Sequence, residues 1–151
     1  MSLLTWDQAL ELRRGKKLIF TNGVFDILHA GHVAYLQQAR NLGDLLIVGI
    51  NADESARSLG KGEDRPIHTL EDRASVLAAL RFVDGVVAFE ERTPERVIEA
   101  LKPEVHVKGG DYDPETMPET PVVRAYGGEV AILPLLPGKS TTEIAKRIRG
   151  E

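Results

Sequence analysis

LIFTNGVFDILHAGH, residues 18–32, joins an apolar run to two histidines placed around a glycine. The run predicts a strand, and the pattern after it predicts a helix. A helix start that follows a strand suits a phosphate chain, because it offers unpaired backbone N–H groups and the positive end of the helix dipole. His29 and His32 can add two imidazole donors to the same anion, and Gly31 leaves room for a ligand close to the backbone. The alternative interpretation of this turn is an ordinary capped helix start.

Strand-like and helical patterns alternate along the rest of the chain. Strands are expected at about 17–22, 45–50, 86–89, 105–107 and 130–133. Helices are expected at about 5–14, 31–42, 69–80 and 118–126, and from about residues 93 and 140 onward. The second strand is apolar on both faces, which is typical of a buried parallel strand. This alternation predicts an α/β domain with a parallel sheet and right-handed crossovers.

Cap signals mark several of the expected helix ends. Thr5 and Gln8 are spaced as a capping box for the first helix, and Gly43 is placed to terminate the second. Thr93 and Pro94 predict a later helix that has a capping residue followed by proline at its first position.

The composition limits what the chain can be. Its 151 residues are 42% hydrophobic, which fits one domain over residues 1–151 with a sizeable core. There is no cysteine, so disulfides, thiolate metal sites and a cysteine nucleophile are excluded. The net charge is −4 with both signs interspersed, and no apolar run approaches the ~20 residues of a membrane span. We therefore expect a soluble cytoplasmic protein without a nucleic-acid or membrane partner.

Two further polar clusters directly follow predicted strands. They are residues 108–112, KGGDY, and residues 138–142, GKSTT. Ligands of parallel sheets bind at the carboxyl ends of the strands, where the strand order reverses, so these clusters and the histidine turn can meet in space. Each cluster alone is explained equally well as loop and cap chemistry. Together they predict a phosphate-binding site.

Residues 21–53 resemble the cytidylyltransferase-like nucleotidyltransferase superfamily, whose signature His-x-Gly-His matches residues 29–32. Five segments are similar to the adenylyltransferase domain of bacterial ADP-heptose synthases: Arg65-Pro66, residues 70–73 (LEDR), 108–112, 127–130 (GGEV) and 140–142 (STT). The likeness covers nearly the whole chain and implies the single-domain form of this transferase. The implied fold class is α/β, a Rossmann-like three-layer sandwich with a five-stranded parallel sheet of strand order 3-2-1-4-5.

The resemblance implies transfer of AMP from ATP to D-glycero-D-manno-heptose 1-phosphate, which gives ADP-heptose and pyrophosphate. The attacking oxygen belongs to a phosphate that is already ionised, so no strong general base is required. The reaction needs two aligned polyanions and stabilised charge on the α-phosphate and the leaving group. The implied partners are therefore ATP and a sugar 1-phosphate, and a homodimer is left open.

The resemblance also implies catalytic roles for four residues. His29 and His32 would donate to the nucleotide phosphates, and Lys61 and Arg73 would neutralise the phosphates of the two substrates. For Arg73 the alternative is a solvated side chain or an ion pair with its neighbours Glu71 or Asp72. For Lys61 it is a solvated side chain, because residues 60–65, GKGEDR, read as a flexible stretch. The spacing before Arg65 is also one residue longer than in the family that the chain resembles.

The expected nucleotide-binding residues come from the same segments. They are Asn22, Gly23, Phe25, Gly31, Lys108, Gly109, Asp111, Ser140, Thr141 and Thr142. Adenine is expected over Gly109 and Gly110, and the ribose is expected near Asn51 or Asp53. Mg²⁺ is the expected cofactor, bound mainly by phosphate oxygens, with Asp26 as its one candidate protein partner.

Other conspicuous side chains are expected to be structural. His106 lies between two valines of a predicted strand, and Tyr35 falls in a helical pattern. His68 is expected near the mouth of the site without a defined role. The histidine pair has no third ligand at a recognisable spacing, so no zinc site is expected.

Three other functions remain to be compared with the adenylyltransferase. A glycerol-3-phosphate cytidylyltransferase or an FMN adenylyltransferase would share the histidine turn, whereas the KGGDY and STT segments favour the heptose enzyme. A module that senses ATP without turnover is the non-enzyme alternative. A Rossmann dehydrogenase is disfavoured, because the first turn lacks Gly-x-Gly-x-x-Gly.

Overall fold

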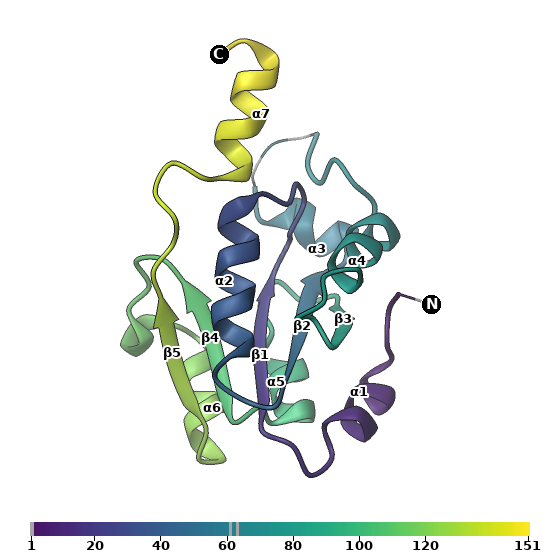
Figure 1. The fold of residues 1–151 in the computed structure, drawn as a ribbon, viewed down its shortest axis with the longest axis vertical. Coiled ribbons are helices and arrows are strands. Elements are labelled where there is room, and N and C mark those ends of the chain that lie inside the picture. The colour runs from purple at the N-terminus through teal and green to yellow at the C-terminus, as the bar shows by residue number, and fades with distance from the viewer. Residues whose placement is uncertain (1, 61, 63) are drawn as a thin grey trace.

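A parallel five-stranded sheet forms the centre of the protein in the computed structural model, which describes residues 2–60, 62 and 64–151. The strands are β1 (Leu18–Gly23), β2 (Leu45–Asn51), β3 (Gly85–Phe89), β4 (Val105–Gly109) and β5 (Glu129–Leu133). All four pairings are parallel and the order is β3-β2-β1-β4-β5, as expected (Figure 1). The helices are α1 (Trp6–Arg13), α2 (Ala30–Arg40), α3 (Asp53–Ser58), α4 (Leu70–Ala78), α5 (Glu95–Leu101), α6 (Glu119–Ala125) and α7 (Thr141–Arg149).

Helices cover both faces of the sheet, which gives the expected three layers. Successive side chains of a strand point to opposite faces, so β1 contributes to two separate cores. Ile19 packs with residues of α2 and α4 on one face, while Leu18 and Phe20 pack with residues of α1, α5 and α6 on the other. The α/β, Rossmann-like fold class is therefore confirmed.

The order of the strands determines where a ligand can enter. From β1 the chain crosses to β2 and β3 on one side, and it then returns to β4 and β5 on the other side of β1. The connections therefore diverge between β1 and β4, and a crevice opens beyond their carboxyl ends. The loop before α2 and the first turn of α7 both lie at this end of the sheet (Figure 1).

Two predicted helix caps are wrong, while the Thr5–Gln8 capping box is confirmed. Pro94 is the N-cap of α5 rather than its first helical residue, and Thr93 does not cap the helix. Gly43 does not terminate α2, which ends at Arg40. Gly43 instead allows close packing, because a Cβ there would lie 2.7 Å from Ile19 Cδ1.

One helix, α3, is absent from the sequence prediction. Its six residues, DESARS, are too short and too polar to show a helical repeat of apolar positions. The structure also shows no helix, among the residues it describes, with the length and hydropathy needed to cross a membrane.

Candidate active site

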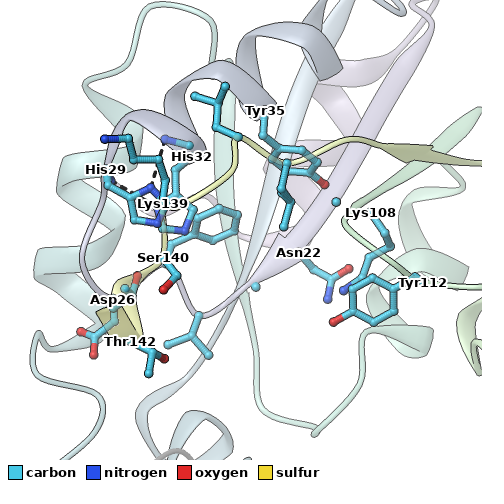
Figure 2. Close-up of a pocket in the computed structure, with 18 of the residues that line it drawn as sticks. Asn22, Asp26, His29, His32, Tyr35, Lys108, Tyr112, Lys139, Ser140 and Thr142 are labelled. Carbon is cyan, nitrogen blue, oxygen red and sulfur yellow. Dashed lines mark hydrogen bonds between the residues drawn. The ribbon is translucent and has the colours of Figure 1, made fainter. Parts of the chain in front are cut away.

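A cavity of about 320 Å³ opens at the carboxyl ends of β1 and β4 (Figure 2). Its wall brings together the three polar clusters of the sequence, although they are up to 120 positions apart. The predicted site residues that line it are Asn22, Gly23, Phe25, Asp26, His29, Gly31, His32, Lys108, Gly109, Ser140, Thr141 and Thr142. The structure thus joins both histidines with every predicted nucleotide-binding residue except Asp111.

The two histidines form a capping box at the start of α2. His29 is the N-cap, and its Nδ1 accepts a hydrogen bond from the backbone N–H of Gly31 at 3.0 Å. The Nδ1 of His32 accepts from the backbone N–H of His29 at 3.3 Å. A neutral imidazole that accepts at Nδ1 carries its proton on Nε2. Capping therefore fixes the tautomer in which both rings carry an Nε2–H donor. The two histidines can thus cap the helix and also donate to an anion, so the two interpretations of this turn are compatible.

Charge and burial keep the His29 ring neutral. Burial lowers the pKa of His29, and the nearby positive charge of Lys139 lowers it further. The ring centres of His29 and His32 lie 3.9 Å apart, so the two rings stack at one end of the cavity. A neutral ring still donates through Nε2, and positive charge for an anion comes from the lysines that line the same cavity, Lys108 and Lys139.

Gly31 is required for a different reason from the one the sequence suggested. A Cβ at Gly31 would lie 2.8 Å from Cε1 of His29 and 3.1 Å from Cβ of Lys139. The ring of His29 and the chain before α7 therefore fill the space next to this glycine. Phe25, in the same turn, has a φ of 52°, and its ring lies 5.3 Å from that of His32.

The start of α7 also lines the cavity, next to the histidine turn. Ser140 is its N-cap and accepts a hydrogen bond from the backbone N–H of Glu143 at 3.0 Å. The hydroxyl of Thr141 donates to the backbone oxygen of Ile27 at 2.9 Å, which ties α7 to the histidine loop. The positive ends of α2 and α7 thus open on one cavity, an arrangement that favours an anion with several phosphates.

The adenine position expected over Gly109 and Gly110 stays a prediction, and Leu135 lies beside both glycines. A Cβ at Gly109 would lie 2.6 Å from Cδ2 of Leu135, and one at Gly110 would lie 3.2 Å from Cδ1 of the same side chain. Leu135 therefore occupies the side of each glycine to which a Cβ would point. Beside them, the Lys108 ammonium lies 4.8 Å from the centre of the Tyr112 ring.

Asp26 is not a free ligand for a metal ion. Its carboxylate accepts from Arg65 Nε at 2.8 Å and from the backbone N–H groups of Ile67 and His68, at 2.8 and 2.9 Å. Burial by itself would raise the pKa of Asp26, but these bonds and the Arg65 charge outweigh it and hold the pKa below its usual value. The prediction of Asp26 as a magnesium partner is therefore wrong: it clamps the chain around Arg65 to the histidine loop.

This clamp should make the protein sensitive to acid through Asp26. A depressed carboxyl pKa stabilises the fold above the unfolded pKa, near 3.8, and this stability is lost as the pH falls through the lower folded value. We expect Asp26→Asn to reduce the loss of unfolding free energy between about pH 5 and pH 3, measured by urea unfolding. The exposed Asp7→Asn is the control and should keep the wild-type slope. Equal slopes for all three proteins would contradict the role of Asp26.

Arg73 does not reach the cavity. Its side chain is fully buried, and its guanidinium donates to the backbone oxygens of Val24, His68 and Asn51 at 2.9, 3.1 and 2.8 Å. Nη2 also bonds to Asp53 Oδ1 at 2.7 Å. The prediction that Arg73 neutralises substrate phosphate is therefore wrong, as is the alternative of a pair with adjacent acidic residues. It instead joins the ends of β1 and β2 to α3 and α4.

Other predicted positions also lie away from the cavity wall. Asn51 is buried and Asp53 bonds to Arg73, so the ribose contacts expected from these two residues are wrong. Asp111 is exposed and is not among the described lining residues, which does not support its predicted nucleotide contact. Lys61 falls outside the residues that the structure describes.

Sequence reasoning missed several lining residues: Val24, Tyr35, Arg65, Leu135, Leu136 and Lys139. Tyr35 was expected in the core, and its hydroxyl does bond to Thr21 and to the backbone oxygen of Val107, yet the residue also lines the cavity. Lys139 had a detectable signal, because it directly precedes the cap of an expected helix in a phosphate-like cluster.

The fold and the cavity together define an α/β protein with a polar cavity at its strand ends, lined by the N-termini of α2 and α7. The chain belongs to the Cytidylyltransferase-like family, whose profile matches residues 20–146.

Individual relatives agree with this family assignment. A D-beta-D-heptose 1-phosphate adenylyltransferase of Bordetella bronchiseptica is 53% identical over 91% of this chain and 85% of its own length. The bifunctional protein HldE of Geotalea uraniireducens is 56% identical over 92% of this chain. The chain spans only 28% of the length of that bifunctional relative.

Solved structures show the same fold. A lipopolysaccharide core biosynthesis protein from Thermoplasma volcanium has a TM-score of 0.66 and 30% identity, over 81% of this chain and 98% of its own. Pantothenate synthetase from Thermus thermophilus has a TM-score of 0.62 and 18% identity, over 89% of this chain and 61% of its own. The second likeness concerns the fold alone.

Proposed function

We propose that this protein transfers AMP from ATP to a heptose 1-phosphate, such as D-glycero-D-manno-heptose 1-phosphate, and releases pyrophosphate. The observation that carries the proposal is the cavity that two helix N-termini and two imidazole rings, His29 and His32, line together. The identity of the sugar is supported by the Bordetella relative, which matches over most of both chains.

In this proposal the chain acts by alignment and by charge stabilisation. His29 and His32 donate through Nε2 to oxygens of the α-phosphate as charge develops there. The backbone N–H groups at the start of α7, with Ser140 and Thr142, hold the phosphates that leave as pyrophosphate. Lys139 lies beside His29 and supplies positive charge. The acceptor phosphate is already ionised, so none of these residues has to remove a proton.

Mg²⁺ belongs to the proposal as an ion that arrives with the nucleotide. The described residues contain no group of three His, Cys, Asp or Glu side chains able to hold a metal, and the Asp26 carboxylate is already fully bonded. Phosphate oxygens are ordinary Mg²⁺ ligands, and the ion keeps several waters when proteins provide few ligands. The ion would help to neutralise the phosphate charge, and the protein residues retain the roles given above.

The deciding experiment offers ATP and CTP in separate assays against heptose 1-phosphates, glycerol 3-phosphate and FMN, and measures pyrophosphate release. Turnover with ATP and a heptose 1-phosphate is expected. Turnover only with CTP and glycerol 3-phosphate, or only with ATP and FMN, would replace the proposed substrates. ATP binding by calorimetry without pyrophosphate release from any pair would indicate a sensing module. Sedimentation of the same sample tests the homodimer.

Lys108 provides a sharper test of the nucleotide contact. It lines the cavity and carries one of its positive charges, so Lys108→Met should raise the KM for ATP by about 10-fold or more. Lys16→Met is the matched control, since Lys16 is exposed and lies before β1, at the opposite end of the sheet. A KM for ATP that is the same in both variants would contradict the assignment.

A further inference from the structure

His106 is a completely buried imidazole in the middle of the sheet. Its neighbours Val105 and Val107 belong to the core on the α2 face, so His106 points to the opposite face. There it lies level with Phe20 of the adjacent strand, and the two ring centres are 6.0 Å apart. Apolar packing explains Phe20 at this level, but it does not explain an imidazole.

One hydrogen bond connects His106 to the cavity. Asn22 follows Phe20 by two positions on β1, so its side chain lies on the same face and closer to the carboxyl end. The Nε2 of His106 and the Oδ1 of Asn22 are 2.8 Å apart. His106 does not line the cavity, whereas Asn22 does. The histidine can therefore affect a ligand only through its neighbour.

The direction of this bond follows from the other ring nitrogen. Nδ1 of His106 is buried and has no hydrogen-bond partner among the residues that the structure describes. A proton on Nδ1 would be an unsatisfied buried donor, which is costly, so the proton is on Nε2 and the imidazole donates to Asn22. Burial and the Lys108 charge lower the pKa of His106 to about 3, which keeps the ring in this neutral form.

Donation to Oδ1 fixes the orientation of the Asn22 amide. With its oxygen held by His106, the amide has two N–H donors on Nδ2 for a ligand. Asn22 lies one position beyond the Thr21–Val107 pair of β1 and β4, beside Lys108. In Figure 2, Asn22 is drawn with Lys108 and Tyr112, away from His29 and His32. A neutral donor beside a lysine ammonium suits a phosphate oxygen.

We propose that His106 is a positioning residue, which holds the Asn22 amide so that its N–H groups donate to a phosphate oxygen of a bound substrate. This inference rests on the proposed function, because the phosphate belongs either to ATP or to the acceptor. Separate KM values for the two substrates distinguish these sources. Without the histidine, the Asn22 amide can rotate and turn its oxygen toward the phosphate. The partial negative charge of this oxygen would then repel the phosphate.

The test uses variants that separate the Nε2 donor from the rest of the ring. His106→Leu removes the donor and suits the apolar layer, so we expect kcat/KM to fall by about 10-fold or more without a lower melting temperature. His106→Gln places an amide N–H near the position of Nε2 and should recover most of the loss. His106→Asn places its amide near Nδ1 and should not. If the loss of kcat/KM in the three variants instead followed their melting temperatures, His106 would have a structural role alone, and the proposal would be overturned.

A double-mutant cycle shows whether His106 acts through Asn22. In the Asn22→Ala background, His106→Leu should change kcat/KM by less than about two-fold, because the amide it orients is gone. Equal losses in both backgrounds would overturn the proposal, as would a single His106→Leu variant with wild-type KM and kcat for both substrates.

A readout without turnover separates this inference from the proposed function. The side-chain amide protons of Asn22, identified by NMR from the signals that Asn22→Ala removes, should shift in His106→Leu and return in His106→Gln. If the wild-type protein releases no pyrophosphate from any substrate pair, the proposed function fails while the amide shift still tests the bond. An unchanged Asn22 amide signal in His106→Leu would overturn the positioning role itself.

Discussion

Replacement of His29 by asparagine is expected to lower kcat for adenylyl transfer by about 10²- to 10³-fold while the melting temperature stays almost unchanged. Asparagine is a good N-cap, and its Oδ1 can replace the Nδ1 acceptor for the backbone N–H of Gly31. It does not reach the place of Nε2, so the donor to the transition state is lost while the start of α2 is kept. Steady-state kinetics and thermal unfolding measure the two effects separately.

Two further variants make this test specific. His29→Gln keeps an N–H near the position of Nε2 but loses the cap, so it should lower the melting temperature and retain more turnover than His29→Asn. His68→Asn makes the same chemical change at an exposed histidine outside the cavity wall and should leave kcat unchanged. If His29→Asn kept wild-type turnover, the mechanism would have to be abandoned.

Replacement of Arg73 by leucine is expected to destabilise the fold by roughly 3–5 kcal/mol, because it removes the buried guanidinium and leaves the groups that bonded to it without a partner. The backbone oxygens of Val24, His68 and Asn51 would lose their donor, and Asp53 would keep an unpaired charge. For a chain of this size, the melting temperature should fall by roughly 10 °C or more. Urea unfolding gives the free energy directly.

The control for this variant is Arg96→Leu, on the exposed surface of α5. It should change the unfolding free energy by less than about 0.5 kcal/mol. Turnover of Arg73→Leu should follow its folded fraction at each temperature. Strongly reduced turnover in a sample with wild-type stability would instead return Arg73 to the role of a direct phosphate ligand.

Most of the fold could be predicted, because its signals are local. The apolar run of β1, the fully buried β2 and the cap of α7 each lie within a few neighbouring residues. The strand-end rule then placed the three polar clusters together without knowledge of their contacts. The helix α3 escaped prediction because it has six residues, five of them polar, and so shows no repeat of apolar positions.

The site was predicted less completely, because hydrogen-bond partners far apart in sequence decide the role of a polar residue. Asp26 looked like a ligand for a cation until Arg65 and two backbone N–H groups, about 40 positions away, occupied its oxygens. Arg73 was expected to neutralise substrate phosphate, but three backbone oxygens surround its guanidinium. His106 was expected to be structural, and its bond to Asn22, on which the positioning role inferred above depends, gives no signal in the sequence.

The histidine capping box has a consequence for the thermodynamics of substrate binding. The bonds that hold the rings of His29 and His32 are those that begin α2, so both rings lose their rotational freedom when the helix forms. Ordering a mobile side chain at a binding site costs about 0.5–1.5 kcal/mol, and here that entropy is lost during folding rather than on contact with substrate. The rigidity of the donors is therefore a property of the folded protein before any nucleotide binds.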